Sequence, residues 1–136
     1  MRETVLDASV VLKWFRSENE RHLGAARSLR AAFEAGELLV FAPPLLRLEI
    51  VNAAGRRWRW DEASLTDLAT ALDELGFQLQ EPELGRVARW TARGLTAFDA
   101  AYVALAEAEG LGLITDDDLI TALAPHIAVG LGSLAE

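Results

Sequence analysis

The stretch AFDAAYVALAEAEGLGLITDDDL, residues 97–119, decides the fold class. It begins with a long apolar helix pattern that ends at Gly110, a residue type that commonly follows the last turn of a helix. The apolar run GLIT at 112–115 comes next and has the length and composition of a strand buried on both faces. Three aspartates then open a short helix pattern. A helix, a buried strand and a second helix in direct succession are typical of a parallel sheet covered by helices.

The same alternation of strands and helices extends along the whole chain. Further strands are expected at 4–6, 38–43, 77–80 and 127–130, and helices at 8–15, 18–37, 45–60, 61–76, 83–94 and 117–124. No linker or internal repeat interrupts the pattern. We therefore expect a single domain over residues 1–136, with a three-layer α/β/α fold around a parallel sheet of about five short strands.

The composition excludes several classes of protein. The 136 residues include no cysteine, which excludes disulfides, thiolate zinc sites and cysteine nucleophiles and suits a cytoplasmic location. No apolar run reaches the ~18 residues of a membrane span, and the first residues lack the apolar region of a signal peptide. With 13 basic and 21 acidic residues the formal charge is −8. Most nucleic-acid-binding proteins are basic, so any nucleic-acid-binding function would have to account for this acidity.

Acidic side chains follow two of the expected strands. Asp7 comes directly after the first strand, and three aspartates, Asp116 to Asp118, come directly after the strand at 112–115. Because parallel strands end at one edge of their sheet, these carboxylates are expected to lie close together there. Each could instead cap the helix that it precedes, and Thr96 with Asp99 could form a capping pair.

Glu49 is an acid of a different kind, because it has no helix end to cap. It lies in the middle of an apolar helix pattern, where a carboxylate is costly unless it is paired or binds a metal ion. A narrow exposed stripe that Glu49 shares with Asn52 and Arg56 would also accommodate it.

Carboxylates that converge need a counter-charge. Two unit charges ~4 Å apart repel by about 4 kcal/mol at an effective dielectric near 20. Lys13, His22 and His126 lie outside the acidic motifs, so a divalent cation is the expected partner. Ligand sets made only of oxygen favour Mg²⁺ or Mn²⁺. Such an ion can activate water for hydrolysis of a phosphodiester bond.

With these residues in place, the chain resembles the PIN-domain ribonucleases, specifically the VapC-type toxins of bacterial and archaeal toxin–antitoxin systems. The segments VLDASVVLKWF, PPLLRLEIVNA and LTAFDAAYVALAEAEGLGLITDDDL carry the resemblance, in the family's order and spacing and over nearly the whole chain. The resemblance implies a PIN-like α/β/α fold and a Mg²⁺- or Mn²⁺-dependent endoribonuclease that leaves 5′-phosphate and 3′-hydroxyl ends. It also implies a homodimer and inhibition by a cognate antitoxin protein.

The family's four catalytic acids fall on Asp7, Glu49, Asp99 and Asp117. The resemblance implies that the three aspartates hold the metal ion, directly or through water. Glu49 would complete the metal shell or orient the attacking water. Asp117 is chosen among its neighbours because it follows Thr115 with one residue between, which is the family's spacing.

Four further residues are supporting candidates under the same resemblance. Ser9 and Thr115 match hydroxyl positions of the family, and Asn52 falls where the family often has Asn near its Glu. Asp116 occupies a position that is usually small or variable, and it is a helper or a substitute for Asp117.

A mixed basic and aromatic segment follows the helix that carries Glu49. Its residues are Arg56, Arg57, Trp58, Arg59 and Trp60. Alternating arginine and tryptophan suits phosphate contact with base stacking. However, residues two apart on a helix do not share a face, and the resemblance offers an antitoxin groove or dimer contact instead. The sequence favours packing or partner contact over RNA contact.

Two other classes of function share some of these features: phosphotransfer domains and non-catalytic binding modules. A haloacid-dehalogenase-like phosphatase also has an Asp after an early strand, but the sequence from Asp7 to Val11 lacks its second Asp. A receiver domain needs an acidic pair near its start and a late lysine, and this chain has neither. A catalytically inactive PIN-like module that binds RNA or protein is the remaining alternative, and the complete set of four acids argues against it.

Overall fold

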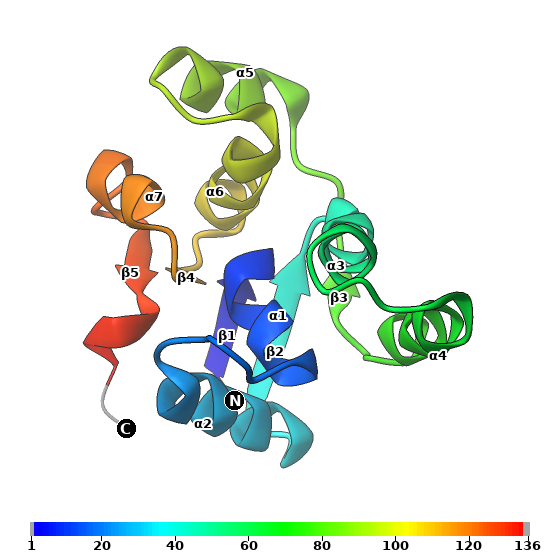
Figure 1. Cartoon of the computed structure of the whole chain (residues 1–136). Coiled ribbons are helices and arrows are strands. Elements are labelled where there is room, and N and C mark those ends of the chain that lie inside the picture. The colour runs from blue at the N-terminus through cyan, green and yellow to red at the C-terminus, as the bar shows by residue number, and fades with distance from the viewer. Residues whose placement is uncertain (1, 135–136) are drawn as a thin grey trace.

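Five short parallel strands form one sheet within residues 2–134, the part of the chain that this computed structural model describes. The strands are β1 (Arg2–Leu6), β2 (Leu38–Ala42), β3 (Gln78–Leu79), β4 (Leu113–Thr115) and β5 (Ala128–Gly130). Their order across the sheet is β3-β2-β1-β4-β5, and every neighbouring pair is parallel (Figure 1). The predicted α/β class and the parallel five-stranded sheet are confirmed.

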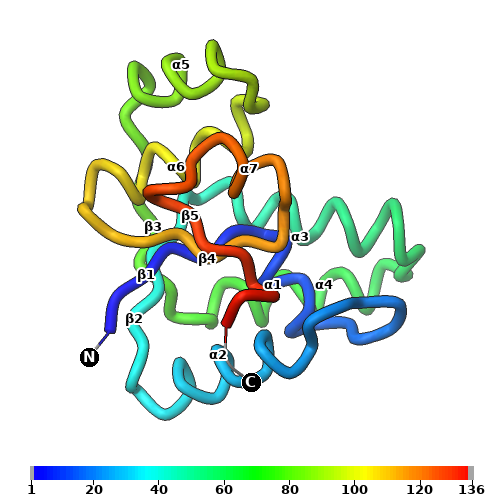
Figure 2. The backbone as a smooth tube through the Cα atoms, turned by 90° about the vertical axis from the view of Figure 1, so that its left-hand side faces the viewer, coloured from blue at the N-terminus to red at the C-terminus, as the bar shows by residue number. Residues whose placement is uncertain are grey.

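Helices flank this sheet. They are α1 (Ala8–Phe15), α2 (Leu23–Glu34), α3 (Leu45–Arg56), α4 (Glu62–Asp73), α5 (Leu84–Ala92), α6 (Ala97–Glu109) and α7 (Asp118–Leu123), and a short 3-10 turn, η1 (Leu131–Ser133), follows β5. Figures 1 and 2 both show α2 on one side of the strands and α5 and α6 on the opposite side. Within residues 2–134, no helix is both long enough and apolar enough to cross a bilayer.

The strand order changes direction between β1 and β4. From the central strand β1 the chain adds β2 and β3 on one side, and then returns to add β4 and β5 on the other. The register pairs Val5 with Leu113 and Leu6 with Ile114, so the residues that follow both strands emerge side by side. In open parallel sheets, ligands bind outside the carboxyl ends of the strands at such a switch point.

Helix α6 anchors the core above this switch point. Its residues from Ala100 to Ala106 are all buried, which explains why this segment is apolar on every side. The side chain of Thr96 accepts a hydrogen bond from the backbone N–H of Asp99 at its start, and Gly110 ends it with a positive φ of 67°. The predicted capping pair and the predicted helix end are both confirmed.

Two predicted helices are shorter than expected. The helix predicted over 18–37 begins only at Leu23, because Asn19 and His22 adopt left-handed φ angles of 58° and 57° that a right-handed helix cannot contain. The helix predicted over 45–60 ends at Arg56, and Arg59 has a φ of 60° in the turn that follows. The two tryptophans of that segment therefore lie in a turn instead of on a helix.

Candidate active site

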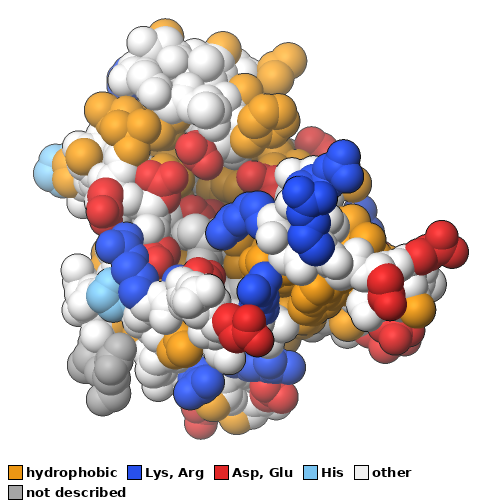
Figure 3. All heavy atoms as spheres, in the orientation of Figure 1, with side chains coloured by type: hydrophobic (Ala, Val, Ile, Leu, Met, Phe, Trp, Pro, Cys, Tyr) orange, Lys and Arg blue, Asp and Glu red, His pale blue; other side chains and the backbone are white. Residues whose placement is uncertain are grey.

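A cavity of about 270 Å³ opens at the switch point. It is lined by Asp7, Ala8, Ser9, Leu12, Glu49, Asn52, Ala53, Arg57, Asp99, Tyr102 and Asp117. Figure 3 shows a hollow in this part of the surface, with Asp and Glu side chains gathered around it and Lys and Arg side chains at its right-hand rim. The four acids expected from the sequence are therefore brought to one cavity, although they come from four separate elements.

Asp7 lies deepest in the cavity, at the junction of β1 and α1, and is 4 % exposed. Ser9 Oγ donates to Asp7 Oδ1 and Thr115 Oγ1 donates to Asp7 Oδ2, each over 2.5 Å. Burial raises the pKa of this carboxyl to about 7, against the lowering effect of the two hydroxyl donors and with a further rise from the charge of Asp99. Asp7 is therefore a fixed acceptor that is poorly solvated when it is ionised.

The same two hydroxyls join Asp7 to the turn between β4 and α7. Ser9 Oγ accepts from the backbone N–H of Asp116 over 2.8 Å, and Thr115 Oγ1 accepts from the backbone N–H of Asp117 over 3.0 Å. Ser9 and Thr115 were predicted as supporting residues. Their hydrogen bonds orient the buried carboxylate of Asp7 and at the same time fix the turn that carries Asp117.

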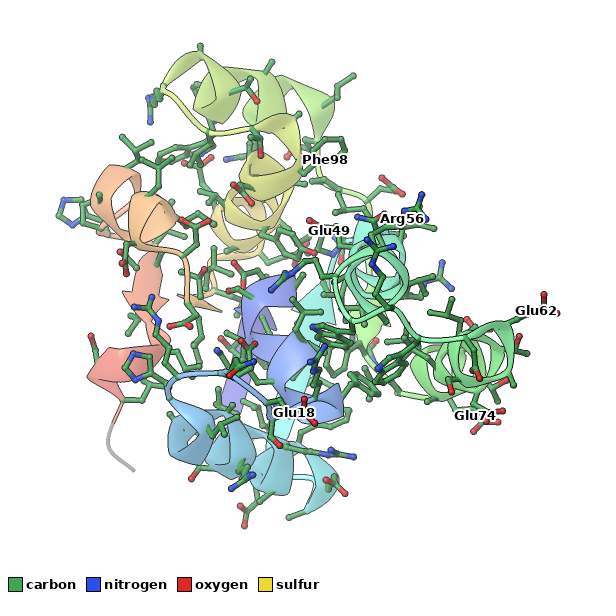
Figure 4. All side chains as sticks on the ribbon, viewed as in Figure 1. Glu18, Glu49, Arg56, Glu62, Glu74 and Phe98 are labelled. Carbon is green, nitrogen blue, oxygen red and sulfur yellow. The ribbon has the colours of Figure 1, made fainter. Side chains whose placement is uncertain are left out.

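Glu49 is half-buried on the face of α3 that looks toward α6 (Figure 4). The hydroxyl of Tyr102 donates to Glu49 Oε1 over 2.5 Å. Burial raises the pKa of Glu49, the tyrosine hydrogen bond opposes that rise, and the charge of Asp99 adds to it. Tyr102 is a site residue that the sequence reasoning missed. It lies three residues after Asp99 on α6, a spacing that places two side chains on one helix face, and this spacing was the available signal.

Asp99 and Asp117 complete the acidic lining, and each also has a capping contact. Burial and the charge of Asp117 both raise the pKa of Asp99. Asp117 Oδ1 accepts from the backbone N–H groups of Leu119 and Ile120, over 2.9 and 3.3 Å, and so caps α7. The sequence offers helix capping and a place in the cavity as alternatives for Asp99 and Asp117. In the structure both residues have both.

Asp116 points to a different environment from Asp117. Its carboxylate lies 3.1 Å from Lys13 Nζ, 3.1 Å from Arg21 Nε and 4.0 Å from His22 Nε2. Lys13 is buried and also lies 3.5 Å from Glu20. The expectation that Lys13 and His22 lie away from the acidic motifs was wrong, because α1 and the loop after it bring both to this turn. Asp116 does not line the cavity.

The remaining candidates are divided between the cavity and its surroundings. Asn52 and Arg57 line the cavity and are exposed. Arg56 and Arg59 are exposed outside it, and Figure 4 shows Arg56 at the end of α3. The two tryptophans, Trp58 and Trp60, are half-buried and line a neighbouring hollow.

None of the four cavity acids has a cationic partner among residues 2–134. Every ion pair within 4.0 Å in that range involves other carboxylates. The donors fit Mg²⁺ or Mn²⁺, because they are carboxylate oxygens whose charges are mutually repulsive and uncompensated. In the described residues no three acids, as their side chains stand, are grouped closely enough to hold one ion. Mg²⁺ is usually held by one or two carboxylates and keeps several waters, so this spacing is compatible with it.

Comparisons with known proteins agree with the fold. A PIN domain family model matches residues 4–124. No curated protein sequence matches the chain significantly. The crystal structure of PAE2754 from Pyrobaculum aerophilum is similar, with 26% sequence identity and a TM-score of 0.68, and the match covers 97% of this chain and 92% of that one. VapC20 from Mycobacterium tuberculosis, a toxin that cleaves the sarcin-ricin loop, matches with 14% identity and a TM-score of 0.65 over 88% of this chain and 93% of that one.

Proposed function

The chain belongs to the PIN domain family, and from this premise we propose that it is a divalent-metal-dependent endoribonuclease. PIN domains are generally nucleases. The observation that carries the proposal is the set of four carboxylates, Asp7, Glu49, Asp99 and Asp117, which line one cavity without a cationic partner in the described part of the chain. Burial and mutual repulsion raise the pKa values of Asp7, Glu49 and Asp99, and a bound divalent cation would offset that repulsion.

We assign the three aspartates as the residues that would hold Mg²⁺ or Mn²⁺, directly or through water. When bound, the ion would activate water and stabilise the charge that develops on the leaving oxygen. Asp7 supplies a carboxylate whose two oxygens are already oriented by hydroxyl donors. Asp117 is held in place through its cap on α7.

We assign Glu49 to the orientation of the attacking water. Its Oε1 accepts from Tyr102, so one oxygen is fixed and the other is free to accept a proton or a hydrogen bond. Burial and the charge of Asp99 raise its pKa, which makes Glu49 a better proton acceptor near neutral pH than an exposed glutamate.

We further propose that the protein is a VapC-type toxin that acts in the cytoplasm as a homodimer and is inhibited by a cognate antitoxin. The fold that it shares with the toxin VapC20 supports this assignment. An apolar surface beside the cavity also supports a protein partner, because Leu48 is 74% exposed and Phe98 is 64% exposed next to Glu49.

The direct test is cleavage of total RNA in Mn²⁺, with and without EDTA, analysed by mapping of 5′ ends. The expected result is discrete cleavage with 5′-phosphate and 3′-hydroxyl products that EDTA abolishes. The Asp7→Asn variant is the matched negative control, since it preserves the size of the side chain and one acceptor oxygen but removes the charge. Cleavage that persists in EDTA, or that is equal in the variant, would contradict the proposed chemistry.

A further inference from the structure

Two hollows lie along the seam between α1 and the end of α3. Ser9 and Leu12 of α1 line the acidic cavity, and Phe15 at the end of α1 and the next residue, Arg16, line a second hollow of about 500 Å³. The opposite wall of both hollows comes from the end of α3 and the residues after it. There Arg57 lines the acidic cavity and the next residue, Trp58, lines the second hollow. A ligand that follows this seam would therefore reach both.

Arg57 is the only basic residue among those that line the acidic cavity. It is exposed, and within residues 2–134 its guanidinium has no hydrogen bond or ion pair within 4.0 Å, although the cavity holds four carboxylates. Its side chain is therefore available to a ligand. A guanidinium fork matches two oxygens of a phosphate.

Trp58 and Trp60 line the second hollow beside the cation Arg16. The turn after α3 brings the rings of Trp58 and Trp60 to a centroid distance of 5.3 Å, and Trp60 N donates to Ala54 O to close that turn. The guanidinium of Arg16 lies 5.4 Å from the ring centroid of Trp58. Its ion pair with Glu18 over 3.1 Å is exposed, and exposed pairs of this kind exchange readily for another anion.

We propose that this seam binds a single strand of RNA, with Arg57 on a backbone phosphate at the acidic cavity and with Trp58 and Trp60 stacking on a base farther along. The residues from Ser9 to Arg16 span about 10 Å of helix, which corresponds to about three nucleotides of a stacked strand. Aromatic side chains beside a cationic track are the usual means of holding a single strand without sequence preference.

The seam also explains how a chain of net charge −8 can hold RNA. Arg16 and Arg57, on opposite walls, place positive charge along the path itself, and the metal ion proposed for the cavity would add more. The inference rests on the proposed nuclease function for its choice of RNA, and it extends that function by naming the residues that bind the strand. Both tryptophans pack on the core, as the sequence favours, and both also line the second hollow, where the proposal adds an RNA contact.

Binding to the Asp7→Asn protein in EDTA is tested with an eight-nucleotide oligoadenylate that carries a 5′ fluorescein, by fluorescence anisotropy for the Kd and by tryptophan quenching for stacking. Trp14 and Trp90 are buried, so quenching in the parent reports on the other two tryptophans. We expect quenching in the parent and a roughly tenfold weaker Kd in Trp58→Leu/Trp60→Leu. Arg57→Gln should weaken binding and reduce the salt dependence of log Kd by about one. Arg2→Gln, at the opposite end of β1, is the control for loss of one positive charge and should bind as the parent does.

Several outcomes would overturn the inference. Affinity equal to the parent's in both the Arg57→Gln and the double tryptophan variant would leave the hollow as a contact for a protein partner. The double tryptophan variant must keep the circular dichroism spectrum and melting temperature of the parent. If the double variant is misfolded, the affinity of Arg57→Gln, which changes an exposed residue, tests the proposal instead. Cleavage by the wild-type chain with unchanged binding in both variants would refute the seam but not the nuclease. Binding that the variants weaken, together with no cleavage of RNA by the wild-type chain in Mn²⁺, would refute the nuclease but not the seam.

Discussion

Asp116 and Asp117 are neighbours in the chain, yet they belong to opposite kinds of electrostatic environment. Asp116 faces Lys13 and Arg21, each at 3.1 Å, so its charge is neutralised within the protein. Asp117 faces a cavity with three other carboxylates and no cation pairs with it among the described residues. A charge that the chain neutralises itself serves the fold, whereas charges that are gathered and left uncompensated are the pattern expected of a ligand site.

The two environments are nevertheless joined by one side chain. Ser9 Oγ donates to Asp7 in the cavity and accepts from the backbone N–H of Asp116. The ion pair between Lys13 and Asp116 therefore holds the β4–α7 turn from one side, while the hydroxyls hold it from the cavity. Substitutions in the cavity should therefore alter mainly activity, and substitutions in the paired cluster should alter mainly stability.

The largest effect is expected from Asp7→Asn. Loss of this carboxylate should reduce RNA cleavage by at least about 1,000-fold, because it removes the charge that would bind the proposed metal ion and that lies at the centre of the hydroxyl network. The fold should remain, since a neutral side chain avoids the cost of burying a charge. Cleavage rates at saturating Mn²⁺ and a thermal melt test both parts. Wild-type activity in this variant would remove Asp7 from the site.

The pH dependence of stability is the next largest effect. The pKa of Asp7 is raised from 3.8 to about 7, so between these values the folded chain keeps a proton that the unfolded chain has lost. The free energy of unfolding attributable to Asp7 therefore falls as pH rises through this window, by as much as about 4 kcal/mol. Urea melts in EDTA at pH 4.5 and 7.5 should show that fall relative to Asp7→Asn, which lacks this titration. Mn²⁺ should recover stability at pH 7.5 in the wild-type chain only.

Asp117→Asn and Asp116→Asn form a matched pair that tests the comparison directly. The first should reduce cleavage about 100-fold, since it removes a charge from the cavity, and asparagine should still cap α7. The second should leave cleavage within about threefold of wild type, because Asp116 does not line the cavity. Initial rates on one RNA substrate distinguish them. If the two results were reversed, Asp116 would be the metal-site acid.

The sequence predicted the order of elements and the four acids, but not the surroundings of each acid. Strand and helix patterns, together with the rule that parallel strands end at one edge, were sufficient to bring Asp7 and Asp117 together. The partners of Asp116 were missed because Arg21 and His22 come from a loop whose left-handed residues carry no apolar pattern. Its course depends on tertiary contacts that periodicity does not encode.

The tryptophans show the same limit at the other end of the site. The pattern around Trp58 and Trp60 extends the helix of Glu49, and two residues that are two apart on a helix point in different directions. The helix instead ends at Arg56, and the positive φ of Arg59 folds the next residues back so that the rings meet. The sequence left packing, partner contact and RNA contact open for this segment, and its geometry depends on the backbone angle of Arg59.

The smallest of these effects is a change in stability from the paired cluster. Lys13→Met should destabilise the fold by about 2 kcal/mol, because it leaves Asp116 without its buried cation. This loss of stability should be smaller than for a buried carboxylate that has lost its only cation, because Arg21 remains 3.1 Å from Asp116. Adding Asp116→Asn should restore part of this stability, because the double variant no longer contains a carboxylate that has lost its cation. Urea melts of the single and double variants measure this coupling. An equal loss in both variants would show that Lys13 acts through its packing on the core and not through the ion pair.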